Sequence, residues 1–86
     1  MTQKFKFHSD PSHGWLEVPV GALAEAQLTL ESFSSYSYIS DDKLTVYLEE
    51  DCDMRKFLSF YPHPTEFIDI STNRSHRIRK LRSIHG

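Results

Sequence analysis

Hydrophobic and polar residues alternate at the start of the chain, where Phe5 and Phe7 are flanked by lysines and a histidine. This period of two predicts a half-buried strand over residues 3–8. The turn-forming run SDPSHG follows, since proline fixes φ and glycine tolerates unusual backbone angles. A second short strand over residues 15–18 is therefore expected to pair with the first as a hairpin.

The next apolar residues recur at helical spacing, and they predict a helix over 20–27. Pro19 suits its first turn, where a missing N–H costs nothing. The run SFSSYSYIS (residues 32–40) then has the pattern of a strand. A short polar connection leads from it to the apolar run 44–48, and this predicts a second hairpin.

A second helix is predicted from residues suited to a helix N-terminus and from the apolar face that follows them. Asp51 is a good N-cap, and Asp53 suits the positive end of the helix dipole. One apolar face follows at Met54, Phe57, Leu58 and Tyr61, and Pro62 ends the helix. A last strand is expected over 66–70. The predicted fold is α+β, with a single antiparallel sheet of four to five strands and one or two short helices packed on one face.

The length of 86 residues gives room for one domain, 1–86, and one core. Charge is sorted along this chain: six of the twelve acidic residues lie between Asp41 and Asp53, and five of the ten basic residues lie between Arg74 and Arg82. Residues 74–86 are therefore expected to form a basic C-terminal arm, either docked or flexible.

The composition also bears on location. One cysteine, Cys52, cannot form an internal disulfide, and small secreted domains usually need several. The first residues lack the apolar run of a signal peptide, and no segment approaches the roughly 18 apolar residues of a membrane span. These features predict a cytoplasmic protein with a reduced thiol and no contact with a membrane.

The first polar segment of interest, Asp10 to Trp15, places a carboxylate, an imidazole and an indole within six residues. One interpretation makes His13 a general base or metal ligand oriented by Asp10. The alternative is a shaped turn, in which Asp10 caps backbone N–H groups and Trp15 anchors the core. We favour the turn.

The second polar segment, Tyr47 to Asp53, has four carboxylates within five positions. Neighbouring residues of a strand face opposite ways, so these side chains are poorly placed to converge on a metal ion, and no metal or other cofactor is predicted. An acidic surface that meets a basic partner and a simple capping role for Asp51 and Asp53 both remain open. Carboxylates disfavour a thiolate, so Cys52 is predicted to be buried and inert.

The basic arm could contact phosphates of a nucleic acid. It could equally pair with the acidic segment of its own chain or of a second copy, which would make a homodimer. The histidines have no zinc-finger spacing.

The strings DPSHGWLEVP, YSY and YLEEDCD resemble an uncharacterised family of small proteins from tailed phages and bacterial mobile elements. The resemblance covers most of residues 7–58, and Ser75 to Arg79 fits a third family element loosely. It implies no activity. It implies an accessory protein expressed in the cytoplasm of a bacterial host.

We therefore expect a non-enzymatic protein-binding module that acts on a host protein, such as a basic nucleic-acid-binding one, and inhibits a host defence system through its acidic surface. One alternative is a small metal-dependent or acid–base enzyme using Asp10, His13, Glu50 and Asp53. Another is a nucleic-acid binder acting through the basic arm. The sequence leaves open whether the two polar segments meet. The predicted binding residues are His13, Trp15, Glu49, Glu50, Asp51 and Asp53.

Overall fold

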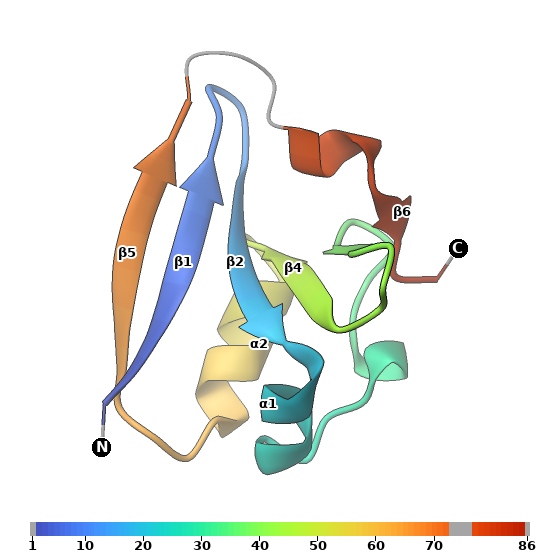
Figure 1. Ribbon diagram of the computed structural model, residues 1–86. Helices are drawn as coiled ribbons and strands as arrows, with labels where there is room; N and C mark the ends of the chain where they lie inside the picture. The colour runs from blue at the N-terminus through green and yellow to red at the C-terminus, as the bar shows by residue number, and fades with distance from the viewer. Residues whose placement is uncertain (1, 73–76, 86) are drawn as a thin grey trace.

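The computed structural model describes residues 2–72 and 77–85, with the side chain of Arg77 left aside. A six-stranded sheet is combined with two α-helices and two short 3-10 helices (Figure 1). In chain order the elements are β1 (Gln3–Ser9), β2 (Gly14–Pro19), α1 (Val20–Glu25), η1 (Leu30–Ser32), β3 (Tyr38–Ile39), β4 (Thr45–Glu49), α2 (Asp53–Phe60), β5 (Thr65–Ser71), η2 (Arg77–Lys80) and β6 (Arg82–Ser83).

The α+β class and the single sheet are confirmed, but the sheet is mixed and has six strands in the order β5-β1-β2-β4-β3-β6. Four of its pairings are antiparallel, and β5 pairs with β1 in parallel. The parallel pair arises because β4, α2 and β5 form a crossover connection that brings the chain back to the same end of the sheet. The sixth strand, β6, comes from residues predicted to be a basic arm.

Two local predictions are wrong in instructive ways. Of the run 32–40, only Tyr38–Ile39 is a strand, because the residues before it form η1 and a loop that is held by a side chain of α2. The N-cap of α2 is Cys52, not Asp51, and no side chain caps this helix. Asp53 does lie in the first turn of α2, as predicted.

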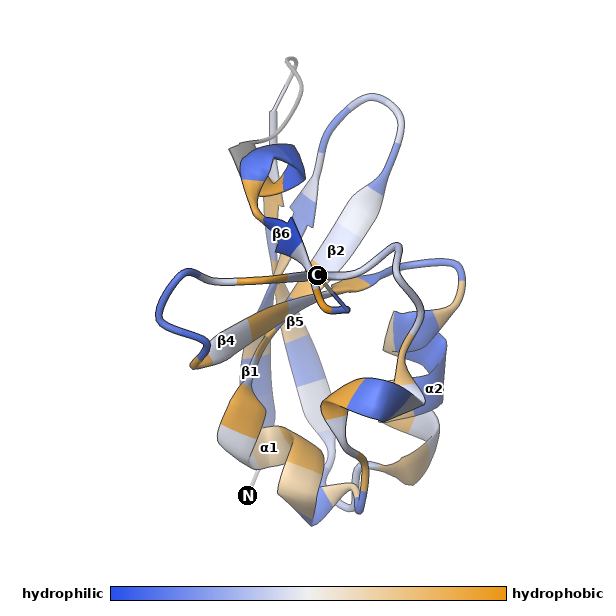
Figure 2. Ribbon diagram, turned by 90° about the vertical axis from the view of Figure 1, so that its right-hand side faces the viewer, coloured by the Kyte–Doolittle hydropathy of each residue, from blue (hydrophilic) through white to orange (hydrophobic). Residues whose placement is uncertain are grey.

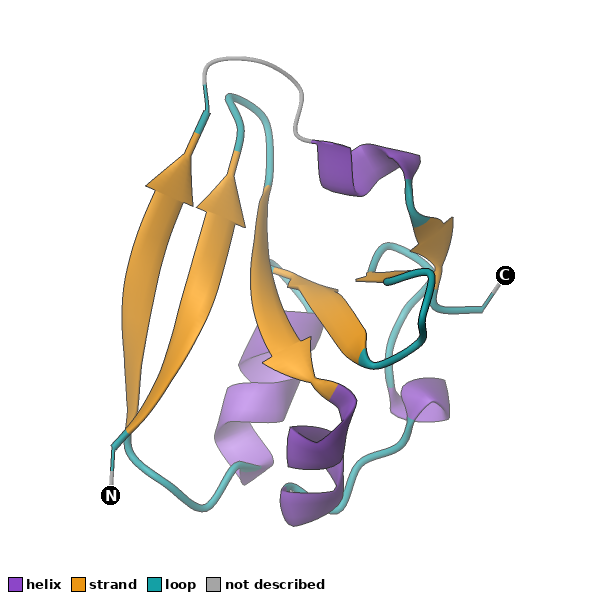
Figure 3. Cartoon of the chain, in the orientation of Figure 1, coloured by secondary structure: helices purple, strands orange, loops and turns teal. Residues whose placement is uncertain are grey.

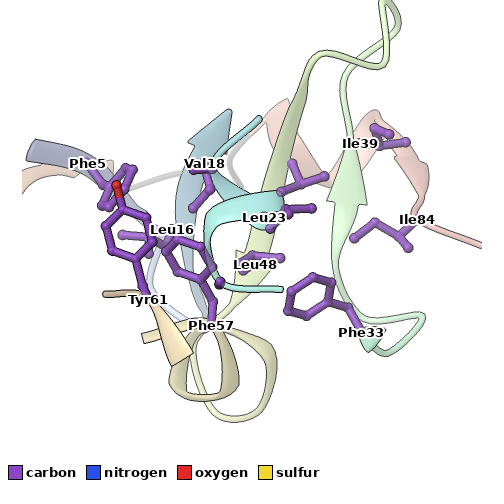
Figure 4. Close-up of a cluster of buried hydrophobic side chains, with 13 residues drawn as sticks. Phe5, Leu16, Val18, Leu23, Phe33, Ile39, Leu48, Phe57, Tyr61 and Ile84 are labelled. Atoms are coloured by element: carbon purple, nitrogen blue, oxygen red, sulfur yellow. The ribbon is translucent and has the colours of Figure 1, made fainter. Parts of the chain in front are cut away.

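The core lies between one face of the sheet and the two helices, which both cover that face (Figures 3 and 4). Helix α2 carries hydrophilic as well as hydrophobic residues (Figure 2), and it buries Phe57 completely. The ring of Phe57 packs edge-on against Phe5 and stacks on Tyr61. Strands β2 and β4 supply most of the other fully buried side chains, among them Leu16, Val18, Val46 and Leu48.

The opposite face of the sheet carries the functional candidates. Trp15 is paired with Glu49, Glu17 with Tyr47, and Tyr38 with Tyr47. Paired residues share a face, and so do alternate residues of one strand. Trp15, Tyr38 and Glu49 therefore lie together on the face away from the helices.

The C-terminal segment is packed over its described part, 77–85. Ile78 is buried, and Ile84 joins the core cluster beside β3 and β6 (Figure 4). Residues 74–76 and 86 of the predicted arm lie outside the described residues. None of the helices in the described ranges has the length and apolarity that a membrane crossing requires.

Candidate functional site

The two polar segments meet. The antiparallel pairing of β2 with β4 sets Trp15 opposite Glu49, and the backbone N–H of Glu50 donates to the carbonyl of Gly14 at 3.0 Å. The hairpin that carries Asp10 and His13 thus lies beside the end of β4 and the start of α2. Segments more than thirty positions apart in the sequence form one site.

Asp10 shapes the hairpin turn as predicted. Its Oδ1 accepts the backbone N–H of Ser12 at 3.0 Å and of His13 at 2.9 Å. The glycine at the end of this turn is needed for space: a Cβ at Gly14 would stand 2.4 Å from Cζ of Phe7. Real Cβ atoms essentially never come this close to another atom, so a side chain at position 14 would force the ring of Phe7 to move.

Arg79 reaches this turn from the C-terminal segment. Its Nε and Nη2 donate to the two carboxylate oxygens of Asp10 at 2.6 and 3.0 Å, and the Asp10 side chain is only 1% exposed. The hydrogen bond to Asp10 raises the pKa of Arg79 above its ordinary value, with burial acting in the opposite direction. The two groups form the bidentate ion pair that suits a guanidinium and a carboxylate.

The same guanidinium organises the two rings of the turn. Arg79 Nη2 lies 2.9 Å from Nδ1 of His13, and its Cζ lies 5.1 Å from the centroid of the Trp15 ring. Arginine can only donate, so Nδ1 of His13 is the acceptor and the neutral ring carries its proton on Nε2. The imidazole stacks on Trp15 with centroids 6.1 Å apart. Arg79, and not Asp10, therefore contacts the ring of His13.

Beside this cluster lies a pocket of about 350 Å³. It is lined by His13, Trp15, Tyr36, Tyr38, Glu49, Asp51, Cys52 and Arg79. Trp15 is 2% exposed and belongs to the floor, whereas Tyr36 is 71% exposed and stands at the rim. Tyr38 packs edge-on against Trp15. The pocket thus combines aromatic surface with two carboxylates, and its volume is at the lower end of the range for ligand sites.

Glu49 is the most unusual residue of the lining, because it is a carboxylate that is only 8% exposed. Its Oε1 accepts the backbone N–H of Asp51 at 3.1 Å. Its Oε2 accepts no hydrogen bond from residues 2–72 and 77–85, and this oxygen keeps some accessible surface. Asp51, by contrast, is exposed at the pocket edge.

Asp53 is buried but serves the neighbouring loop. Its carboxylate accepts the backbone N–H of Ser34 at 3.0 Å, the hydroxyl of Ser34 at 2.7 Å and the hydroxyl of Ser37. The loop between these serines carries Tyr36, so Asp53 positions a wall of the pocket without lining it.

We expect Asp53→Asn to lower the free energy of unfolding by about 2 kcal/mol, since an amide nitrogen would replace one acceptor of several buried hydrogen bonds. Urea unfolding followed by circular dichroism measures this loss. Asp51→Asn is the matched control, because the Asp51 side chain is exposed two positions away. Equal stability of the two variants would contradict a stabilising role for the hydrogen bonds that Asp53 accepts from Ser34 and Ser37.

Glu50 lies on the other side of the sheet. A Cβ built on Gly14 would lie close both to Oε1 of Glu50 and to the ring of Phe7. Phe7 packs against the core, so Glu50 lies on the core side. Asp10, His13, Glu50 and Asp53 therefore do not converge on one point, as the predicted enzyme site would require. The described residues also include no group of three or more His, Cys, Asp or Glu side chains arranged to hold a metal ion.

Four lining residues were not among the predicted binding residues: Tyr36, Tyr38, Cys52 and Arg79. The alternation of the tyrosines was visible in the sequence, but it carried no mark of a site. Arg79 had no local signal, because its partners are 66 and 69 positions away. Cys52 was predicted to be buried, which is wrong: it lies in the turn before α2, is exposed and lines the pocket.

The basic residues of the C-terminal segment are used in different ways. Arg79 is committed to Asp10, whereas Lys80 and Arg82 are exposed. Arg74 lies outside the described residues. Comparisons of the chain with protein-family models, with curated proteins and with solved structures find no match.

Proposed function

We propose that this chain is a non-enzymatic protein-binding module whose contact surface is the pocket between the Asp10–Trp15 turn and the end of β4. One observation carries the proposal: aromatic rings and carboxylates from three separate segments converge on a single pocket. Aromatic residues are enriched at the centres of protein interfaces, where they supply contact area at a low cost in entropy.

The chemistry of the lining favours binding over catalysis. The ring of His13 is hydrogen-bonded to Arg79, which occupies the nitrogen that a general base would use. Asp53 is fully engaged with the serines of the 34–37 loop. Both of these groups therefore hold the shape of the pocket.

The expected partner is a protein with a basic surface. Glu49 and Asp51 give the pocket two carboxylates, and Arg79 is neutralised by Asp10. Opposite charge on the partner would steer association and fix its orientation. The resemblance to tailed-phage proteins extends the proposal to a basic, nucleic-acid-binding protein in the cytoplasm of a bacterial host, whose role in defence would be blocked. Self-association of the chain stays a prediction.

A capture experiment tests the proposal. The tagged protein is incubated with bacterial lysate at low and at physiological salt, beside the double variant Glu49→Gln/Asp51→Asn. We expect the wild type to retain a basic protein, and the double variant to retain at least about tenfold less of it, because both charges facing the partner are gone.

The matched control is Glu31→Gln/Glu66→Gln, which removes the same charge from exposed positions on η1 and β5 that do not line the pocket. This control should capture as much as the wild type. Recovery of no partner at either salt concentration, or equal losses in both double variants, would count against the proposal.

A further inference from the structure

The second oxygen of Glu49 points to the ligand that the pocket would take. The residue is more than nine-tenths buried and lines the pocket, and its Oε2 keeps some accessible surface while it accepts no hydrogen bond within the described ranges. A carboxylate in a mostly buried position loses part of its hydration, and this loss has a cost in free energy where no protein donor replaces the water. A ligand that brings an N–H donor and a positive charge would offset this cost.

The cation already present does not donate to Glu49 and is paired with another carboxylate. Arg79 places Nε and Nη2 on the Asp10 carboxylate, and Nη2 also meets His13. The remaining charged lining residues, Glu49 and Asp51, are both carboxylates. The pocket therefore favours a cation over an anion.

The aromatic lining narrows the class of cation. Tyr36 is largely exposed at the rim, and Tyr38 lies deeper beside Trp15. A guanidinium is planar, is weakly hydrated and stacks on aromatic rings, whereas an ammonium is a compact and strongly hydrated charge. The molecule itself provides an example, since the guanidinium of Arg79 lies over Trp15 while it binds a carboxylate.

We infer that the pocket binds one arginine side chain of the partner protein, with a guanidinium N–H donated to Oε2 of Glu49 and the guanidinium plane against the tyrosine rings. Asp51 at the edge supplies a second acceptor. This inference rests on the proposed function and names the anchor residue of the partner. A single anchor of this kind is typical of the few residues that dominate binding energy at an interface.

A titration with small blocked amino acids tests the inference without a partner protein. N-acetyl-arginine-N-methylamide is added to the ¹⁵N-labelled protein, and amide shifts are followed by NMR. We expect saturable shifts at Tyr36, Tyr38, Glu49 and Asp51. The citrulline analogue has the same shape without the charge and should bind at least about tenfold more weakly, as should the lysine analogue.

Two variants localise the effect. Glu49→Gln retains an oxygen for the Asp51 N–H but removes the charge, and we expect it to weaken arginine binding about tenfold. Tyr36→Ala changes an exposed residue that the fold does not bury, so it tests the aromatic contact without a risk to folding. The control is Glu50→Gln, which makes the same chemical change one position away, on the Phe7 side of the sheet. Its affinity should equal that of the wild type.

The outcomes distinguish a failure of the arginine site from a failure of the proposed protein-binding function. Equal binding of citrulline and arginine, equal losses in Glu49→Gln and Glu50→Gln, or no saturable shift would overturn the arginine site. If the lysate partner is nevertheless captured in a Glu49-dependent manner, the binding module stands and its anchor is a different group. Failure of both experiments would remove both proposals.

Discussion

Replacing Phe57 by alanine is expected to lower the free energy of unfolding by about 3–5 kcal/mol. The ring has no exposed surface and contacts Phe5 and Tyr61, so its removal leaves a cavity between α2 and the sheet. The free energy of unfolding of native domains is only about 5–15 kcal/mol, and a chain of this size is expected at the lower end of that range because it buries little surface. Urea denaturation followed by far-UV circular dichroism measures the loss.

Phe60 provides the matched control, because it lies in the same helix and is 58% exposed. Phe60→Ala removes the same atoms from a side chain that buries little, and we expect it to change stability by less than about 1 kcal/mol. Similar losses in the two variants would mean that α2 does not pack on the sheet through the face described.

The second large effect is expected at Asp10, where Asp10→Asn should cost about 3 kcal/mol. The substitution removes the buried negative charge that holds Arg79, and it puts an N–H₂ group where an oxygen accepts hydrogen bonds. An unpaired guanidinium beside Trp15 would draw the C-terminal segment toward water. Amide hydrogen exchange should therefore accelerate at Ile78 and Leu81 well before the sheet opens.

A double-mutant cycle separates the pair from its surroundings. Arg79→Met keeps an apolar stem of similar length over Trp15, so Asp10→Asn/Arg79→Met should lose less stability than the two single variants added together. Asp42→Asn is the control for charge, since that carboxylate is exposed in the turn before β4. A strictly additive cycle would show that the ion pair does not fasten the C-terminal segment.

Local pattern was sufficient for much of the fold. The alternation around Phe5 identified β1, and the apolar stripe through Phe57 identified α2. Both patterns are set by the spacing of residues within one short segment. The parallel pairing of β5 with β1 was not predictable, since it depends on where a crossover delivers the chain. The same limit applied to the run 32–40, where the hydrogen bonds of Asp53 to Ser34 and Ser37 override a strand-like pattern.

Only part of the candidate site was predictable, because some of its residues stand out in the local sequence and others are placed by tertiary packing. Glu49, Asp51, His13 and Trp15 stood out as polar or aromatic residues near strand ends, and they do line one pocket. The sequence could not distinguish Glu49 from Glu50, because the facing of adjacent strand residues depends on register. Nor could it indicate Arg79, whose role arises from tertiary packing alone.

The bond between Arg79 and Asp10 spans 69 positions of the sequence, and β1 pairs with a strand that begins at Thr65. Contacts between distant parts of a chain slow folding, because loop-closure entropy is lost before those contacts form. The pocket therefore has no local precursor: its walls come together only when nearly the whole described chain has found its place. A half-synthesised or half-folded molecule therefore lacks the pocket, and any ligand of the pocket would bind only chains that have completed folding.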